Sequence, residues 1–593
     1  MPATLRLLYS GGMMWRGLWA LALVFAAGCS SSECKSEAPV CSADAKKLTR
    51  CEGGKEVVTD CFGAGQLCEA GACVLASRFG APVYPSCPGE PHAAPGTLAS
   101  KAAGYDDVAR RLHVNPALGW ALPVLLKGRT SSCAAGVTPP CVSATEPAVP
   151  ESTATQADVA AWFSGENDGL WSALYLTAQA YRYGATKSPE ALSMIKLLLA
   201  GEVKRMQITG VPGVFTRQLI PPGVPGLSCP SADEEYLVDA EKDDNQWVQI
   251  REDGCVWVVA RETHAWTKTD HCGLDDFKGW CWLDNVSKDE YAGHMLALAA
   301  LLRLVDEAEV QATVRDLLGQ VGSHLVQHEL TLVDWDGRTT EHGHFSPAAF
   351  DDYPGFNAAM GLAYLAAAIA AQRDPAVVAY RDQCVLQKSG RHPCLGLQEP
   401  ESFLLQLTAP NAAGLYVGPE ACGSNYNNIS MHMLSLLTLL LVEEEPAIRA
   451  IAQQHLEQEA FLADQPRALS KQHNALFDFI FAAMKSLGPG TSGPALDAVN
   501  DGVCQLRQFR ASQARAEVRR TADQVPYCKN RFEEDVGQHP RETWQRCTKT
   551  FVWWSDPYDL DDCDANARVI DPPAGYLLPY WMGRYYGFIS PEL

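Results

Sequence analysis

Five long apolar segments at helical spacing constrain the fold of this chain more than any other feature. They are apolar nearly all round and rich in Ala, Gly and Ser, a composition that is typical of buried helices. Most are followed by a more amphipathic helical segment. The apolar segments are 169–183, 290–305, 356–372, 429–445 and 475–487, and the amphipathic ones are 188–206, 307–330, 446–463 and 493–514.

This alternation predicts a mostly α fold in which each buried inner helix is paired with a half-buried outer helix. Repeated about six times, the pattern describes a closed (α/α)6 toroid. The sixth inner helix is expected at either 118–126 or 576–589. An α-solenoid is the alternative, but the inner segments are irregularly spaced and no fixed repeat is visible.

Residues 207–286 interrupt the helical pattern. This segment is rich in Trp, Cys and charge, and we expect a long irregular insertion, of a length that is usually functional. Within it, the run CVWVVA at 255–260 predicts a short strand.

The N-terminus has the features of a targeting segment. Arg6 and Arg16 are followed by an apolar run at 18–27, which at about ten residues is too short to cross a bilayer. The run ends in small residues before Cys29, an order that resembles the lipobox of bacterial lipoproteins. This resemblance implies that residues 1–28 are a signal peptide and that Cys29 is acylated. The protein is therefore expected outside the cytoplasm, anchored to a bacterial membrane at the outer membrane or cell surface.

The cysteine count agrees with an oxidising compartment. There are 21 cysteines, and 20 remain if Cys29 carries lipid. Six of them fall in a Gly-rich polar module at 29–75, where three disulfides are expected to replace a core. Their connectivity stays open, and a zinc site is disfavoured because the cluster has neither a C-x-x-C pair nor a His. The six are Cys34, Cys41, Cys51, Cys61, Cys68 and Cys73.

Other cysteines lie close together in pairs and predict loop-closing disulfides: Cys133 with Cys141, Cys272 with Cys281, and Cys384 with Cys394. After the Cys-rich module, residues 76–104 are nonperiodic and predict a linker. The large helical domain then covers 105–593, with the insertion at 207–286.

The net charge of −22 limits the partners of this chain. Strong acidity disfavours nucleic acid and electrostatic capture by an anionic membrane surface. It also disfavours a highly anionic glycan, although a local basic pocket can override the overall charge.

Several stretches together resemble the six-hairpin (α/α) toroid proteins of bacteria, a class with many glycan-active hydrolases and lyases. The resemblance covers about 105–593 and implies an active site in the funnel at the N-terminal ends of the inner helices. The stretches are GENDGLWSALYLTAQAYRYGAT, TGVPGVFTR, SKDEYAGHMLALAALLRLV, LVDWDGRTTEHGHFSP, SNYNNISMHMLSLL and LLPYWMGRYYGFI. Polar clusters precede the inner helices and are expected to converge there. They are 166–168, 287–290, 356–357, 425–428 and 473–474.

Glycoside hydrolysis needs two carboxyl groups, and the acids at the helix starts are the candidates. Asp168 and Asp289 are the predicted pair, Glu290 and Asp336 are further catalytic candidates, and Glu166 and Glu341 are held in reserve. Structural roles compete with this prediction. Asp168 suits a helix N-cap, and Ser287 with Glu290 matches the S-x-x-E capping box.

A second set of residues is predicted to bind the substrate. Its aromatic members would stack on sugar rings, and its polar members would hold hydroxyl or carboxylate groups. The Trp residues of the insertion are expected at the surface. The set is Glu166, Trp171, Arg217, Trp266, Trp282, His294, His342, His344, Asn425, Asn427 and His473.

No cofactor is expected. Asp334, Asp336 and Glu341 partly match a calcium loop, but the full twelve-residue pattern is absent. The prediction is a carbohydrate-active protein that hydrolyses glycosidic bonds. A polysaccharide lyase with a His or Tyr base is the second enzymatic alternative. A non-catalytic protein that binds glycan or cell-wall material is the third.

Overall fold

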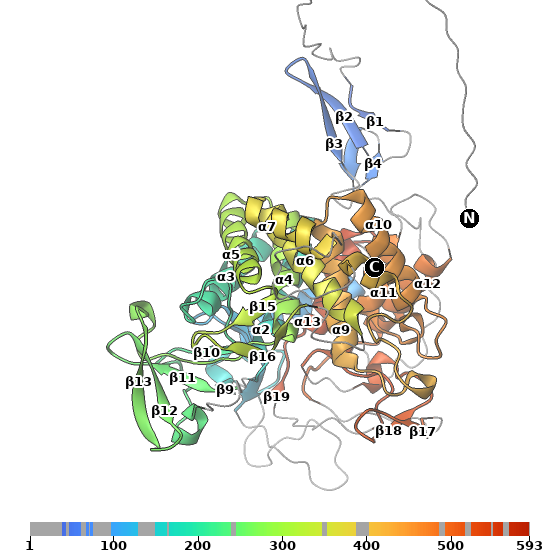
Figure 1. Ribbon diagram of the computed structural model, residues 1–593. Coiled ribbons are helices and arrows are strands. Elements are labelled where there is room, and N and C mark those ends of the chain that lie inside the picture. The colour runs from blue at the N-terminus through green and yellow to red at the C-terminus, as the bar shows by residue number, and fades with distance from the viewer. Residues whose placement is uncertain are drawn as a thin grey trace, which may run out of the picture.

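The computed structural model describes residues 38–42, 47–60, 67–69, 71–74, 96–127, 149–162, 165–238, 245–346, 353–386, 402–485, 493–515, 524–546, 550–560, 569–591 and 593. Over these residues the chain forms thirteen α-helices and several small sheets of antiparallel strands (Figure 1). The predicted mostly α class is therefore confirmed.

All five predicted apolar segments form buried helices, and the sixth is the last helix of the chain. Their buried side chains belong to one continuous hydrophobic cluster. The option at 118–126 is wrong, because strands β7 (Trp120–Ala121) and β8 (Val124–Leu126) occupy that segment. The buried helices are α2 (Asp168–Thr186), α4 (Lys288–Leu304), α6 (Pro354–Gln372), α9 (Tyr426–Val442), α11 (Ala475–Lys485) and α13 (Ala574–Tyr585).

The amphipathic segments also form helices, and each follows a buried helix in the chain. Ser188 shows why one of them begins where it does: its side chain accepts a hydrogen bond from the backbone N–H of Ala191, and Pro189 takes the first helical position. These helices are α3 (Pro189–Gln207), α5 (Ala308–Gln327), α10 (Pro446–His455) and α12 (Pro494–Arg507). The remaining helices are α1 (Leu98–Val108), α7 (Pro375–Tyr380) and α8 (Phe403–Thr408).

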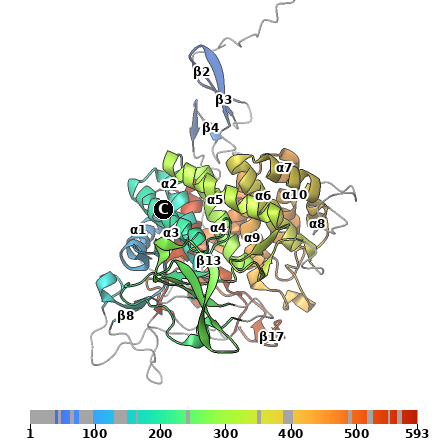
Figure 2. The ribbon, with the colours of Figure 1, turned by 60° about the vertical axis from the view of Figure 1, so that its left-hand side comes forward.

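The insertion is not irregular, which corrects the prediction. It forms a five-stranded antiparallel sheet in the order β10-β14-β11-β12-β13, below the helices in both views (Figures 1 and 2). The strand predicted at 255–260 is confirmed as β12. Apolar residues buried between the sheet and its surroundings stabilise these strands. The strands are β10 (Gln218–Ile220), β11 (Trp247–Ile250), β12 (Cys255–Ala260), β13 (Ala265–Cys272) and β14 (Cys281–Leu283).

The register of this sheet also corrects a disulfide. Cys255 lies opposite Cys272 in the β12–β13 pair and bonds to it, and Cys281 bonds to Cys229. The predicted Cys272–Cys281 bond is therefore wrong, because strand register decided the pairing and closeness in sequence did not. A further disulfide joins Cys422 to Cys528, 106 residues apart. Cys384 is disulfide-bonded, while Cys133, Cys141 and Cys394 lie outside the described residues.

The Cys-rich module is built from short strands (blue in Figure 1). The Cys41–Cys68 disulfide packs with Leu48 in a very small core, and Cys51 and Cys73 are disulfide-bonded as well. The strands are β1 (Val40–Cys41), β2 (Lys47–Glu52), β3 (Lys55–Asp60), β4 (Leu67–Glu69) and β5 (Ala72–Val74). The signal segment 1–28, Cys29, Cys34 and Cys61 lie outside the described residues. Helix α1 begins at Leu98, inside the segment predicted as a linker.

Short strands complete the body of the protein. They are β6 (Val114–Asn115), β9 (Val159–Trp162), β15 (Thr331–Val333), β16 (Thr339–His344), β17 (Pro526–Lys529), β18 (Asp535–Gly537) and β19 (Val569–Ile570). In the described part of the chain, one helix, α6, is long and apolar enough to cross a membrane, and its side chains are mostly buried.

Candidate active site

A cavity of about 690 Å³ lies where the N-terminal ends of α2, α4, α6 and α9 meet strand β16. Four of the five polar clusters predicted to converge contribute residues to its wall. The members from the helix starts are Glu166, Asn167, Ser287, Lys288, Asp289, Phe356, Asn425, Asn427 and Asn428. The remainder of the wall is Arg217, Asn245, Glu341, His342, His344, Tyr353, Gly414, Val417, Gly423, Met431 and Arg531.

Asn167 links two of these helix starts. It occupies the N-cap position of α2, but its side chain makes no capping hydrogen bond. Instead, its Nδ2 donates to Asp289 Oδ2 at 2.8 Å and its Oδ1 accepts from Arg217 Nη1 at 3.2 Å. The Asn167 side chain therefore bridges Asp289 and Arg217 and does not cap α2. Its sequence context gave no sign of the bridge, because both partners are distant in the chain.

Asp289 is a predicted catalytic residue whose carboxylate is held in place at the cavity wall. It lines the cavity in the first turn of α4, and both carboxylate oxygens accept hydrogen bonds, Oδ2 from Asn167 and Oδ1 from the Ser287 hydroxyl. Ser287 is the N-cap residue of α4 but forms no capping bond, so the predicted capping box is wrong. The serine orients the carboxylate of Asp289 instead.

Asp168, the other half of the predicted pair, does not line the cavity. Its side chain is 2% exposed, and Oδ1 accepts a hydrogen bond from the backbone N–H of Gly165 at 3.0 Å. The first turn of α2 points this carboxylate into the protein. The predicted pairing of Asp168 with Asp289 at one open mouth is therefore corrected.

Glu290 and His294 are also buried, in a charged cluster between α4 and α3. His294 Nδ1 lies 2.6 Å from Glu202 Oε2, and His294 Nε2 lies 3.4 Å from Glu290 Oε2. Burial raises the pKa of Glu290. Burial alone would lower the pKa of His294, but the neighbouring carboxylates outweigh it and raise that pKa. Arg205 packs its guanidinium 3.3 Å above the Trp120 ring beside them. Neither predicted residue lines the cavity.

Lys288 is a wall residue that the sequence reasoning did not select. Its Nζ donates to Asn357 Oδ1 at 3.2 Å, and Asn357 Nδ2 in turn donates to the Ser346 carbonyl at 2.8 Å. Burial lowers the pKa of Lys288 to about 8, although Asp289 opposes the shift. The same surroundings act on His344, because burial and the charge of Lys288 lower the pKa of that imidazole.

Strand β16 brings Glu341, His342 and His344 to the cavity wall. The backbone N–H of Glu341 donates to Asn285 Oδ1 at 2.8 Å, which fixes the strand against the start of α4. Asp336, at the preceding turn, forms an ion pair with Arg338 and does not line the cavity.

The partial calcium pattern does not close into a site. Asp334 is buried and accepts hydrogen bonds from the backbone N–H groups of Trp335 and Asn285. Within the residues that the structure describes, no group of three or more His, Cys, Asp or Glu side chains could hold a metal ion.

Asn425 and Asn427 contribute to the wall from the start of α9. Asn425 Oδ1 caps the helix by accepting from the Asn427 N–H at 3.1 Å. Asn427 Oδ1 accepts from Trp554 Nε1 at 2.6 Å, which leaves its amide nitrogen as the donor for a ligand. Trp171 packs edge-on against Trp554 and does not line the cavity.

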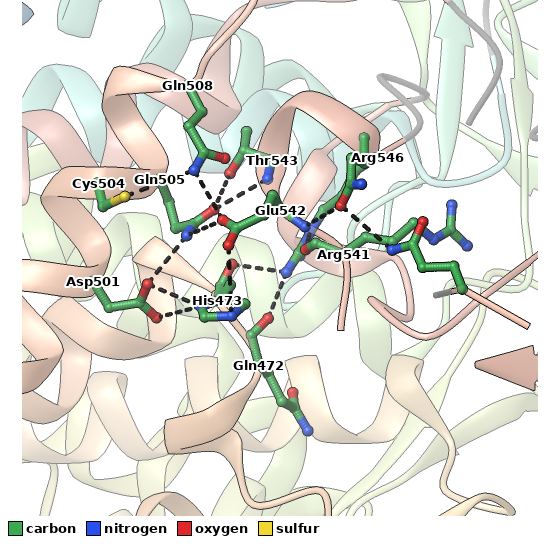
Figure 3. A network of polar contacts seen from close by, with 12 residues as sticks. Gln472, His473, Asp501, Cys504, Gln505, Gln508, Arg541, Glu542, Thr543 and Arg546 are labelled. Atoms are coloured by element: carbon green, nitrogen blue, oxygen red, sulfur yellow. Dashed lines mark hydrogen bonds and ion pairs between the residues drawn. The ribbon is translucent and has the colours of Figure 1, made fainter. Parts of the chain in front are cut away.

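Besides Trp171 and His294, three more predicted binding residues lie away from the cavity. Trp282 is fully buried in β14, so its expected surface position is wrong. Trp266 packs against Tyr236 and Arg251 on the sheet. His473 belongs to the polar network in Figure 3, with Nδ1 2.9 Å from Asp501 Oδ1 and Nε2 3.8 Å from Glu542 Oε1. Its cluster is the one that does not reach the cavity wall.

No protein-family model matches the chain, and no curated protein is significantly similar to it. The inference of function therefore depends on the chemistry of the cavity.

Proposed function

We propose that this protein is a carbohydrate-active enzyme that hydrolyses glycosidic bonds in the cavity at the start of α4. The observation that carries the proposal is the presence of three carboxylates, Glu166, Asp289 and Glu341, around one cavity. Five asparagines and the ring of Tyr353 share its wall, and amides with an aromatic ring suit a ligand covered in hydroxyl groups.

The proposed architecture is the (α/α)6 toroid. Its inner helices would be α2, α4, α6, α9, α11 and α13. Packing between the ends of the chain supports closure, because α13 contacts both α2 and α11, so the last buried helix lies beside the first. The cavity lies at the N-terminal ends of several of these helices, where the fold would place its funnel.

Asp289 and Glu341 are our catalytic pair. One acts as the general acid and the other as the base or nucleophile. Asp289 is held by two hydrogen bonds, and Glu341 lies on a strand whose backbone is bonded to Asn285. Residues on regular elements hold their geometry better than residues on turns. Glu166, which precedes α2 and lies outside a regular element, is the weaker candidate.

The test is turnover on a panel of purified polysaccharides, with products separated by mass. We expect wild-type protein to release reducing ends from at least one glycan. Asp289→Asn and Glu341→Gln should each lower the rate by about 10²–10⁴-fold, the usual contribution of an acid or base. Asp336→Asn is the matched control, because this acid is near β16 but outside the cavity wall.

The products also separate the alternatives. A product chain that ends in an unsaturated uronate would show that the enzyme is a lyase and not a hydrolase. Saturable glycan binding without turnover would exclude both enzymatic reactions and indicate a glycan-binding protein. Unchanged activity in folded Asp289→Asn and Glu341→Gln proteins would remove these residues from the mechanism.

We also propose that the enzyme is held at a bacterial membrane by lipid on Cys29. The disulfides of the described residues support an oxidising compartment. The lipid anchor would hold the enzyme at the membrane surface, where it would encounter polymeric glycans.

A further inference from the structure

Among the described residues, the three basic side chains of the cavity form hydrogen bonds and ring contacts with neutral groups. Arg217 donates from Nε to the Asn285 carbonyl at 2.7 Å and from Nη1 to Asn167. Lys288 donates to an amide oxygen, and the Arg531 guanidinium lies 4.3 Å from the centre of the Phe532 ring. Across the described residues, none of the three forms an ion pair with a carboxylate.

Some basic residues elsewhere in this acidic protein pair with carboxylates, whereas others, such as Lys204 and Lys471, bind backbone carbonyls. Lys196 Nζ lies 3.0 Å from Glu307 Oε1 and 2.7 Å from Glu309 Oε2. Arg515 makes two hydrogen bonds to Asp571 in the interior. The chain has 70 acidic residues for 48 lysines and arginines, so partners are abundant. What distinguishes Arg217, Lys288 and Arg531 is that they line one cavity together, where none of them forms an ion pair with another described residue.

Lys288 is the most constrained of the three. Asn357 is fully buried, and its amide is oriented by the bond to Ser346, so its Oδ1 faces the ammonium. That bond uses one of three N–H donors and supplies no counter-charge. Keeping a partly desolvated ammonium without a carboxylate bond is costly, which agrees with its lowered pKa.

We propose that the glycan bound in this cavity is acidic, and that Lys288, Arg217 and Arg531 hold its carboxylate or sulfate group. The inference rests on the proposed function and names the substrate class of the same site. An oxyanion would supply the missing counter-charge through charge-assisted hydrogen bonds, which are stronger than neutral ones. The three cations share the cavity wall with the carboxylates of Glu166, Asp289 and Glu341, and they place local positive charge in a chain whose net charge is −22.

The experiment compares each acidic polysaccharide with its own neutral form. Polygalacturonate and hyaluronan oligosaccharides are measured beside their carboxyl-reduced products, and a sulfated galactan beside its desulfated product. Binding to the full chain is followed by calorimetry, and turnover by product release. We expect the acidic form to bind about tenfold more tightly or better, as one charge-assisted contact provides. The carboxylate and sulfate pairs identify which oxyanion is recognised.

Two variants assign the preference to the cavity. Lys288→Gln keeps a donor for Asn357 but removes the charge, and Arg531→Gln changes an exposed turn residue whose loss leaves the core intact. Both should reduce the preference for the acidic form. Lys471→Gln removes an equal charge from a lysine that is exposed, bonded to the Gln465 carbonyl and outside the cavity wall, and should leave the preference unchanged.

The outcomes separate this inference from the proposed function. Equal binding or turnover of acidic and neutral forms overturns the inference and leaves hydrolysis standing. A preference that survives in both Lys288→Gln and Arg531→Gln also overturns it. Preferential binding of the acidic form without turnover supports the inference and removes hydrolysis. Failure to bind any glycan removes both.

Discussion

Gly293 lets α4 pack closely against α2, and its replacement tests how rigidly the cavity is built. A Cβ added at Gly293 would lie 2.8 Å from both Cα and Cδ1 of Leu170, and 3.1 Å from its carbonyl oxygen. Carbon atoms in contact normally lie about 3.5–4.0 Å apart. Two of these three atoms, Cα and the carbonyl oxygen, belong to the backbone, so Gly293→Ala must move α2 away from α4 by roughly 0.7 Å.

Two opposing effects set the expected change in stability. Alanine inside a helix is better than glycine by about 1 kcal/mol. Overpacking a dense core costs about 1–3 kcal/mol, and a clash with backbone belongs at the upper end. We therefore expect Gly293→Ala to lower the free energy of unfolding by about 2 kcal/mol. The same displacement would lengthen the 2.8 Å bond between Asn167 and Asp289, so activity should fall as well.

The assay is equilibrium unfolding in urea, with turnover measured on the same preparations. Gly104→Ala is the matched control, because this glycine is exposed within α1 and a Cβ there meets nothing within 4 Å. The control should be unchanged or stabilised by up to about 1 kcal/mol. Gly293→Ala protein as stable and as active as Gly104→Ala protein would refute the claim that helix contact fixes the cavity.

Three further predictions follow from the site and the sheet. Asn167→Ala releases Asp289 and Arg217 and should lower kcat by up to about 100-fold with little change in unfolding free energy, as kinetics and urea titration would show. Affinity for an acidic ligand should fall as pH rises through about 8, because Lys288 loses its proton there. Asp289 and His344 are the titratable groups that interact with this lysine. Calorimetry on the Lys288→Gln protein should show no such fall in affinity near pH 8. Trp282→Ala should lower the free energy of unfolding by about 3–5 kcal/mol, because the ring is fully buried. Thermal unfolding measures this loss, and a small loss would indicate that Trp282 is a surface residue.

The location of the protein is tested separately. Cys29→Ala should move the protein from the membrane fraction to the soluble fraction, because the thiol that carries lipid is gone. Fractionation followed by immunoblotting measures this. Retention of the variant in the membrane fraction would contradict the proposed anchor.

Much of the helical structure could be predicted from the sequence because helices are built from local contacts. Apolar residues recurring around a whole turn require burial wherever the helix finally packs, so α2, α4, α6, α9 and α11 were all anticipated. The sheet in the insertion was not, apart from β12. Its strands pair across up to 65 residues, as β10 does with β14, and such pairing leaves little trace in a local window.

The candidate site shows the same division. The sequence by itself placed acids and amides at the starts of buried helices, and it identified Asp289, Glu341, His342, His344 and Asn425 as residues that could meet a ligand.

Which acid faces the cavity was decided by tertiary structure alone. Asp168 and Asp289 both belong to the first turn of a buried helix, yet one carboxylate is enclosed and the other lines the wall. Successive helical residues point about 100° apart, so the orientation of each helix against its neighbours selects the side chain that reaches the open space. That orientation depends on contacts such as those of Gly293 with Leu170, whose partners are far apart in the chain.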